Sequence, residues 1–259
     1  LISELRAAIA DDALTLHYQP KLDMLDGKVL GVEALLRWPQ WSAIPTEYLI
    51  RTAEKTSLIK PLTQWVLRTA IRQIGQWRDN GLELAVAVNL STWNLAHSDL
   101  DATIQQLLQT HGVAADLLEL EITENAMMQN PERAHAILDR LAALGVRLTV
   151  DDYGTGYSSL AHLKNMPVDR IKIDKSFVSD MTTDENDAVI VRSTIDLAHN
   201  LGMQVIAEGV GNRETWEMLE ALGCDAAQGF FIAHPLPAQA LEDWLNGGNR
   251  DSGGASLRA

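Results

Sequence analysis

Short apolar stretches recur along the chain, and each of them ends in polar residues. Most of these stretches are separated by segments with helical periodicity, such as 61–81 and 131–145, the second of which has proline near its start and glycine at its end. This alternation predicts an α/β fold with a mainly parallel sheet. The predicted strands cover residues 14–20, 29–38, 82–91, 117–124, 146–154, 169–175, 203–210 and 224–232.

The number of strands and the first connection narrow the fold class. Eight strands in about 250 residues is the size of a (β/α)8 barrel, although a doubly wound open sheet gives a similar pattern. The first two strands are separated only by DMLDGK, residues 23–28, which is too short for a parallel crossover. We therefore expect a modified (β/α)8 TIM-like barrel with an antiparallel first strand.

The chain reads as one domain with a short tail. No Pro/Gly/Ser-rich linker divides it, so we assign residues 1–247 to the domain and 248–259, which have the composition of a disordered tail, to the C-terminus. Residues 1–14 have the pattern of an amphipathic helix rather than a signal peptide. No apolar run approaches the roughly 20 residues that a membrane span needs, so we expect no membrane contact by this segment.

Composition and charge exclude some classes of function. The 259 residues are 46% hydrophobic and 22% charged, which is enough to enclose a large core. A formal net charge of −14 disfavours binding to a polynucleotide, but bound divalent ions could still attract a small phosphorylated ligand. Cys224 is the only cysteine, which excludes an internal disulfide and suits a cytoplasmic location.

Polar side chains occupy the carboxyl ends of seven predicted strands, which is where barrel enzymes keep their chemistry. One such carboxylate alone would usually be a solvated residue or a helix cap, but seven strands that contribute to one end indicate a shared site. Residues two apart share a strand face, so Thr149 precedes Asp151 on the inward face. Glu119 shares the face of Glu121, and the sequence leaves its role open. The strand-end residues are Glu33, Asn89, Glu121, Asp151, Asp152, Lys172, Asp174, Glu208 and Gln228.

The chemistry of these groups points to a divalent cation. Carboxylates and an amide aimed at one place form an oxygen-rich site that suits Mg²⁺ or Mn²⁺ better than zinc. A lysine among them can position or deprotonate an attacking water, or neutralise phosphate charge. The pattern therefore predicts metal-assisted phosphoryl transfer.

Seven motifs in order resemble the EAL-domain family of cyclic di-GMP phosphodiesterases, from about residue 4 to residue 245. The resemblance implies a modified barrel with an antiparallel first strand. It also implies hydrolysis of cyclic di-GMP to linear 5′-pGpG with two Mg²⁺ or Mn²⁺ ions per active site, and inhibition by Ca²⁺. The motifs are EALLRW (33–38), NLS (89–91), EITE (121–124), DDYGTGYSSL (151–160), KID (172–174), AEGV (207–210) and QGFF (228–231).

The resemblance also implies a role for each residue. Lys172 would hold the attacking water, and Arg37 and Gln19 would contact the substrate. Glu124 would anchor the catalytic loop that begins at Asp151. The implied catalytic residues are Lys172, Glu208, Glu124, Asp174 and Gln228, of which Asp174 and Gln228 would orient Lys172 and the site. The implied ligands are Glu33, Asn89, Glu121 and Asp151 for the first ion, and Asp151, Asp152 and Glu208 for the second.

Two departures from the family pattern stand out. The connection after Trp38 is about three residues shorter than usual, which concerns the local loop but no metal ligand. Gly211 follows AEGV where the family usually has another glutamate. The sequence leaves open whether Gly211 has a left-handed backbone that a glutamate could adopt only with strain.

Three functions compete at this point. An active phosphodiesterase is favoured because the ligand set is complete, whereas a receptor that binds cyclic di-GMP without cleaving it would be expected to lack ligands. An unrelated metal-dependent barrel enzyme would have to match seven ordered motifs by chance. The family resemblance further implies a homodimer formed through barrel helices. Because the chain begins inside the first predicted helix, we also expect a regulatory domain on a longer protein.

Overall fold

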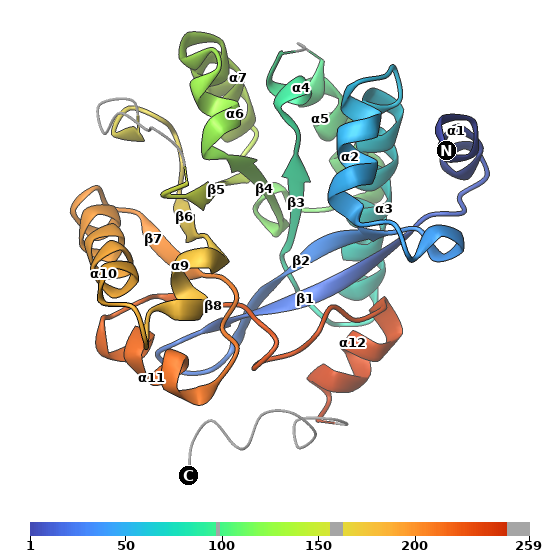
Figure 1. Cartoon of the computed structure of the whole chain (residues 1–259). Coiled ribbons are helices and arrows are strands. Elements are labelled where there is room, and N and C mark those ends of the chain that lie inside the picture. Colours follow the sequence, from blue (N-terminus) through green and yellow to red (C-terminus); the bar gives the residue numbers. More distant parts are fainter. Residues whose placement is uncertain (97–98, 156–162, 248–259) are drawn as a thin grey trace.

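The structure is a computed structural model that describes residues 1–96, 99–155 and 163–247. Its centre is a closed barrel in which the strands are neighbours in chain order from β1 round to β8 (Figure 1). The closed barrel confirms the predicted fold class and excludes the open doubly wound sheet. The strands are β1 (Thr15–Asp23), β2 (Val29–Arg37), β3 (Val86–Leu90), β4 (Leu118–Thr123), β5 (Arg147–Tyr153), β6 (Arg170–Ile173), β7 (Gln204–Ala207) and β8 (Ala226–Ala227).

Strand β1 runs against the rest of the barrel. It pairs antiparallel with both β2 and β8, while the other neighbouring strands pair in parallel. A tight connection reverses the chain: the Asp23 carboxylate accepts hydrogen bonds from the backbone N–H groups of Leu25 and Asp26, at 2.7 and 3.2 Å, and Gly27 takes a φ of +69°. The prediction of an antiparallel first strand is confirmed.

The helices surround the barrel (Figure 1). The predicted helical segments 61–81 and 131–145 correspond to α3 and α7, and the Asn130 side chain caps α7 by accepting from the backbone N–H of Arg133 at 3.2 Å. The helices are α1 (Ile2–Ala10), α2 (Thr46–Glu54), α3 (Ile59–Asp79), α4 (Thr92–Ala96), α5 (Leu100–His111), α6 (Glu124–Met128), α7 (Pro131–Ala143), α9 (Lys175–Asp180), α10 (Glu185–Asn200), α11 (Arg213–Ala221) and α12 (Ala238–Leu245), with 3-10 turns η1 (Pro39–Trp41) and η2 (Ala115–Leu117).

The hydrophobic core lies between the sheet and the helices, whereas the interior of the barrel is polar. Strand β4 shows this division: Leu118, Leu120 and Ile122 are fully buried apolar residues. The alternate residues Glu119 and Glu121 contact charged side chains from β1 and β6 across the barrel. Alternation thus sends apolar side chains outward to the helices and charged ones inward.

The last strand is shorter than predicted. The predicted strand 224–232 was too long, because pairing stops at Ala227. Gly229 packs so closely on the backbone of Val210 that a Cβ would lie 2.2 Å from the Val210 carbonyl oxygen, and Ile232 N–H donates back to the Gly229 carbonyl at 3.0 Å. The chain therefore turns from Gly229 onward, one residue after Gln228, whose backbone still bonds to Ala207 and Val210.

The domain boundary at residue 247 stays a prediction, and the tail 248–259 lies outside the described residues. Among the helices in the described part, none combines the length and the apolar composition that crossing a membrane requires.

Candidate active site

A β-bulge at the end of β5 brings two consecutive aspartates to the mouth of the barrel. The register of β5 against β6 shifts between Val150 and Tyr153, and Asp152 takes a left-handed φ of 54°. Strict alternation would send adjacent side chains to opposite faces. Instead, carboxylate oxygens of Asp151, Asp152 and Glu208 all lie within 4.8 Å of one another.

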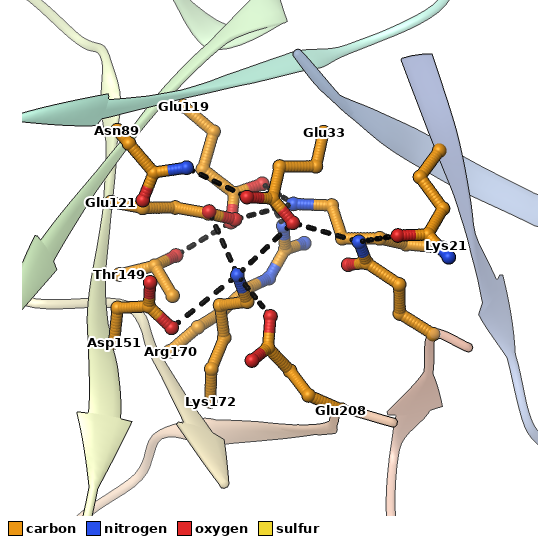
Figure 2. Close-up of polar contacts among 12 residues, drawn as sticks. Lys21, Glu33, Asn89, Glu119, Glu121, Thr149, Asp151, Arg170, Lys172 and Glu208 are labelled. Atoms are coloured by element: carbon orange, nitrogen blue, oxygen red, sulfur yellow. Dashed lines mark hydrogen bonds and ion pairs between the residues drawn. The ribbon is translucent and has the colours of Figure 1, made fainter. Parts of the chain in front are cut away.

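Lys172 lies at the centre of the site, where it is fully buried. Its Nζ atom is 2.6 Å from Oε1 of Glu208 and 2.8 Å from Oε2 of Glu121. It is also 3.4 Å from both Oε2 of Glu33 and Oδ1 of Asp151 (Figure 2). One ammonium group from β6 is therefore shared by four carboxylates from β2, β4, β5 and the end of β7.

Two amides contact Glu33 directly, and a third contacts one of these two. Asn89 Nδ2 donates to Oε1 of Glu33 at 2.6 Å, and Gln228 Nε2 donates to its Oε2 at 2.7 Å. Gln228 Nε2 also donates to Oε1 of Gln19 at 3.0 Å, and Gln19 Nε2 donates to the Ala233 carbonyl at 3.0 Å. The buried Oε1 of Gln228 has no hydrogen-bond partner among the described residues. The predicted residues Asn89, Gln228 and Gln19 thus form one network around Glu33.

The electrostatics show an excess of negative charge. Burial disfavours the charge on Lys172, but the surrounding carboxylates hold its pKa well above the usual value. Burial alone would raise the pKa of Glu33, yet Lys172 and the hydrogen bonds from Gln228 and Asn89 lower it. Burial raises the pKa of Glu208 to about 7, assisted by neighbouring carboxylates and opposed by Lys172.

The excess of negative charge includes the β-bulge at the end of β5, where Asp151 and Asp152 lie. Burial, together with the charges of Asp151 and Asp174, raises the pKa of Asp152 to about 6. A raised carboxylate pKa means that the ionised form lacks sufficient compensation. Oxygen donors with uncompensated charge suit Mg²⁺ or Mn²⁺, so the donor set fits the predicted divalent cations.

Glu124 anchors the start of the predicted catalytic loop. Its buried carboxylate accepts a hydrogen bond from the backbone N–H of Gly154 at 2.9 Å, directly after β5. The anchoring role of Glu124 stays a prediction. The loop residues 156–160 of the predicted motif lie outside the described residues.

Asp174 lies beside the site rather than within the carboxylate cluster. Its Oδ1 accepts from the backbone N–H of Ser176 at 2.9 Å and so caps α9. It is also close enough to Asp152 for its charge to contribute to the raised pKa of that carboxyl. Its electrostatic effect is on Asp152, so any influence on Lys172 would be indirect.

One cavity opens at the mouth, and a second lies beside the connection after β2. The larger, of about 610 Å³, is lined on one side by Asn89, Asp151 and Asp152 and on the other by side chains of α2 and α3 such as Ile50. The smaller, of about 390 Å³, is bordered by Arg37 beside the connection after β2. Arg37 donates from Nη1 to the carbonyl of the preceding Leu36 at 2.8 Å and lies at the rim of the site.

A second charged layer lies one step deeper in the barrel, and the sequence did not reveal it. Glu119 receives hydrogen bonds from Thr149 at 2.6 Å and Arg170 at 2.9 Å, and an ion pair from Lys21 at 2.9 Å (Figure 2). The sequence signal that could have located this layer is the two-residue step between side chains on the same face of a strand. Each of these residues stands two positions from one already singled out at the mouth, as the pairs Lys21/Gln19, Glu119/Glu121, Thr149/Asp151 and Arg170/Lys172.

Gly211 does not have the backbone that would exclude a side chain. Its φ lies outside the left-handed region, and a Cβ there would meet only the Gly209 carbonyl oxygen, at 3.9 Å. Gly209 itself has a φ of +73°, and a Cβ there would lie 2.5 Å from Cβ of Lys175. Glycine is therefore required at 209 but not at 211.

Comparison with known proteins identifies the family. Residues 2–235 match the family model described as the EAL domain. The chain belongs to the EAL-domain family. This EAL domain is 41% identical over 244 residues, 93% of the chain, to the bifunctional diguanylate cyclase/cyclic di-GMP phosphodiesterase MucR of Pseudomonas aeruginosa. It is 39% identical over 246 residues, 94% of the chain, to the cyclic di-GMP phosphodiesterase PdeR of Escherichia coli.

Solved structures agree with this assignment. The EAL domain superposes on the PaMucR phosphodiesterase in its c-di-GMP complex with a TM-score of 0.89 and 40% identity, covering 93% of this chain and 98% of that one. The matched regions are only 36% of MucR and 37% of PdeR, so the chain spans little more than a third of these curated relatives.

Proposed function

We propose that this EAL domain is a metal-dependent phosphodiesterase that hydrolyses cyclic di-GMP to linear 5′-pGpG. The observation that carries the proposal is the set of undercompensated carboxylates at the mouth, beside a cavity of about 610 Å³. Such a volume lies within the range of small-molecule sites. The names of MucR and PdeR, and the PaMucR complex, support cyclic di-GMP as the substrate.

The chain's own donors would hold two Mg²⁺ or Mn²⁺ ions. Bound ions would lower the pKa of water and neutralise charge on the phosphate. Asp151, shared between the two sets, stands at the bulge where the carboxylates of three residues converge. The proposed ligands are Glu33, Asn89, Glu121 and Asp151 for one ion, and Asp151, Asp152 and Glu208 for the other.

Lys172 would orient the water that attacks phosphorus. Its ammonium carries three donors, has no acceptor and is already directed at the carboxylates of the site. In the proposed reaction the water oxygen forms a new bond to phosphorus, the bond from phosphorus to one ribose 3′-oxygen breaks, and that oxygen takes a proton. The ring opens to a 5′-phosphorylated dinucleotide.

The remaining residues would position the substrate and the loop. Arg37 at the rim is proposed to contact a substrate phosphate, and Gln19 to contact the nucleotide near Gln228. Gln228 supports Glu33 directly at 2.7 Å. Glu124 would hold the start of the catalytic loop through Gly154, and Asp174 would act through Asp152.

A direct assay tests this function against the receptor alternative. The purified chain is incubated with cyclic di-GMP and Mg²⁺ or Mn²⁺, and the products are separated by chromatography, with a chelator-treated sample as control. We expect 5′-pGpG to form only when metal is present. Nucleotide binding without any turnover in either metal would show a receptor instead.

Assembly and location are further parts of the proposal. We propose that the domain acts as a homodimer within a longer regulatory protein; the greater length of MucR and PdeR supports the second point. Monomeric sedimentation at high concentration would contradict the dimer. A single buried thiol, Cys224, is consistent with the proposed cytoplasmic location.

A further inference from the structure

The deeper charged layer is joined to the mouth through one side chain. Lys21 of β1 is 2% exposed, and its Nζ atom lies 2.9 Å from Oε2 of Glu119 and 3.3 Å from Oε1 of Glu121. Arg170, the other cation of the deeper layer, pairs with Glu119 and Gln204. Among the described contacts, Lys21 is therefore the link between Glu119 below and Glu121 above.

The barrel interior provides space for this long side chain. Lys21 pairs across the sheet with Gly31 of β2, and the neighbouring small residues are Ala85, directly before β3, and Ala87 on β3. A Cβ on Gly31 would lie 2.8 Å from the carbonyl oxygen of Ala85. Small residues on β2 and β3 thus leave room for the large charged ones from β1, β4 and β6.

The two oxygens of Glu121 have different partners. Oε1 accepts from Lys21, whereas Oε2 accepts from Lys172 at 2.8 Å, among the carboxylates of the mouth (Figure 2). Because Lys21 holds Oε1 from the deeper layer, the Glu121 carboxylate is fixed in an orientation in which Oε2 faces the mouth. Groups that fix a ligand in this way commonly change metal affinity by tens of fold.

We propose that Lys21 is a positioning residue, which holds Oε1 of Glu121 so that Oε2 is presented to the divalent cation. This inference rests on the proposed function, because it assigns Glu121 to a metal site. Lys21 is suited to the role because its removal leaves neither glutamate without a cation: Glu119 keeps Arg170, and Glu121 keeps Lys172.

The test compares Lys21→Met with Arg170→Met. Both variants remove one cation from Glu119, but only the first also removes a contact with Glu121. Calorimetric titration with Mn²⁺ alone, without nucleotide, measures the metal site apart from turnover. We expect Lys21→Met to weaken Mn²⁺ binding by about 10- to 100-fold and Arg170→Met to change it by less than about threefold.

Melting temperatures separate metal affinity from stability. Both variants should melt at a lower temperature than the unchanged chain, because each removes a buried cation. A difference between the two variants in Mn²⁺ affinity but not in melting temperature therefore reports on the contact with Glu121. Lys21→Gln, which keeps one neutral donor, is a milder second variant if Lys21→Met does not fold. Its expected Mn²⁺ affinity lies between those of Lys21→Met and the unchanged chain.

Several results would overturn the assignment. Mn²⁺ binding by the Lys21 variants as tight as in the unchanged chain would make Lys21 a structural residue, and tighter binding would show that it only repels the cation. An equal loss of Mn²⁺ affinity in Arg170→Met would indicate that the total charge of the deeper layer, rather than the contact between Lys21 and Glu121, affects metal binding. If the unchanged chain itself failed to bind Mn²⁺, the proposed metal-dependent function would be contradicted. If the unchanged chain bound Mn²⁺ and the Lys21 variants bound it equally well, only the role of Lys21 would be contradicted.

Discussion

The barrel interior contains two charged layers with opposite balances. At the mouth, four carboxylates surround Lys172, and Glu208 has its pKa raised to about 7 by burial and neighbouring carboxylates. One step deeper, Glu119 alone faces both Lys21 and Arg170, and although burial opposes ionisation these two cations lower its pKa to about 2. The mouth has too little positive charge, while the deeper layer has enough.

This contrast separates a ligand site from a structural ion cluster. Buried charges need compensation, and a cluster that is complete in itself gains nothing from an added cation. A cluster that is short of positive charge gains stability when a divalent cation binds. Both layers are polar, and the charge balance is the feature that marks the mouth as the candidate functional region.

The largest effect is expected when a ligand is removed from the mouth. Glu33→Ala should lower turnover by more than about 100-fold and weaken Mn²⁺ binding, because loss of a direct ligand exceeds the usual effect of a supporting group. The fold should remain, since Lys172 keeps three other carboxylates. Turnover and calorimetry with Mn²⁺ check both points. Near-normal turnover would remove Glu33 from the ligand set.

Lys172→Met should sharpen the contrast between the layers. Turnover should fall by about 100-fold or more because the attacking water loses its partner, while much of the nucleotide binding remains. Without metal, the four carboxylates would lose their shared cation, at a cost of about 3–5 kcal/mol in unfolding free energy. Mg²⁺ should restore much of this loss.

Arg170→Met is the matched control in the deeper layer. It should also lower the melting temperature, but Mg²⁺ should restore none of the loss beyond the stabilisation that the unchanged chain gains. Melting curves with and without Mg²⁺ measure the difference. Equal metal rescue in both variants would abolish the distinction between the layers, and an equal loss of nucleotide binding and turnover in Lys172→Met would make Lys172 a phosphate clamp.

Replacing Mg²⁺ by Ca²⁺ tests whether the mouth is a tuned site or only a region of negative charge. Ca²⁺ should bind but lower turnover roughly tenfold or more, because it prefers longer bonds and looser geometry than Mg²⁺. Product formation in each metal, together with competition of Ca²⁺ against Mg²⁺, provides the measurement. Full activity in Ca²⁺ would mean that charge alone is sufficient.

Much of the fold and of the mouth could be predicted from the sequence. Apolar stretches with polar ends gave the strands, and the short connection at 23–28 predicted the antiparallel β1, because pairing direction depends on connection length. The residues Glu33, Glu121 and Lys172, which were predicted at strand ends, do meet, although Glu33 lies in the middle of β2. Residues at the carboxyl ends of parallel strands converge whatever the details of packing, which makes this level of prediction robust.

The deeper layer and the bulge were beyond the sequence pattern for physical reasons. Lys21 belongs to a strand that runs the opposite way, so its distance from the mouth follows only from the register of β1 against β2. Asp152 depends on a register shift and a φ of 54°, which break the alternation that the prediction used. Alternation alone could not distinguish a metal ligand from a structural partner at Glu119.

The smallest predicted effect concerns Gly211, in the loop after β7. A side chain at position 211 would not strain the backbone, because φ is not left-handed and the nearest atom to a Cβ would be 3.9 Å away. Gly211→Ala is therefore expected to leave the melting temperature nearly unchanged. It serves as the matched control for a charged substitution at the same position.

Gly211→Glu should add negative charge near Glu208, three residues earlier, where the mouth is proposed to bind its second cation. A supporting carboxylate of this kind can strengthen metal binding up to about tenfold, which is less than the effect of a direct ligand. We expect a lower Mg²⁺ concentration for half-maximal activity and higher turnover than in Gly211→Ala, with little change in nucleotide affinity. Metal titrations of the two variants, with melting temperatures measured alongside, decide the matter. An unchanged Mg²⁺ requirement would show that position 211 does not support the site. A lower melting temperature in the glutamate variant alone would show that the added carboxylate only increases the excess of negative charge at the mouth.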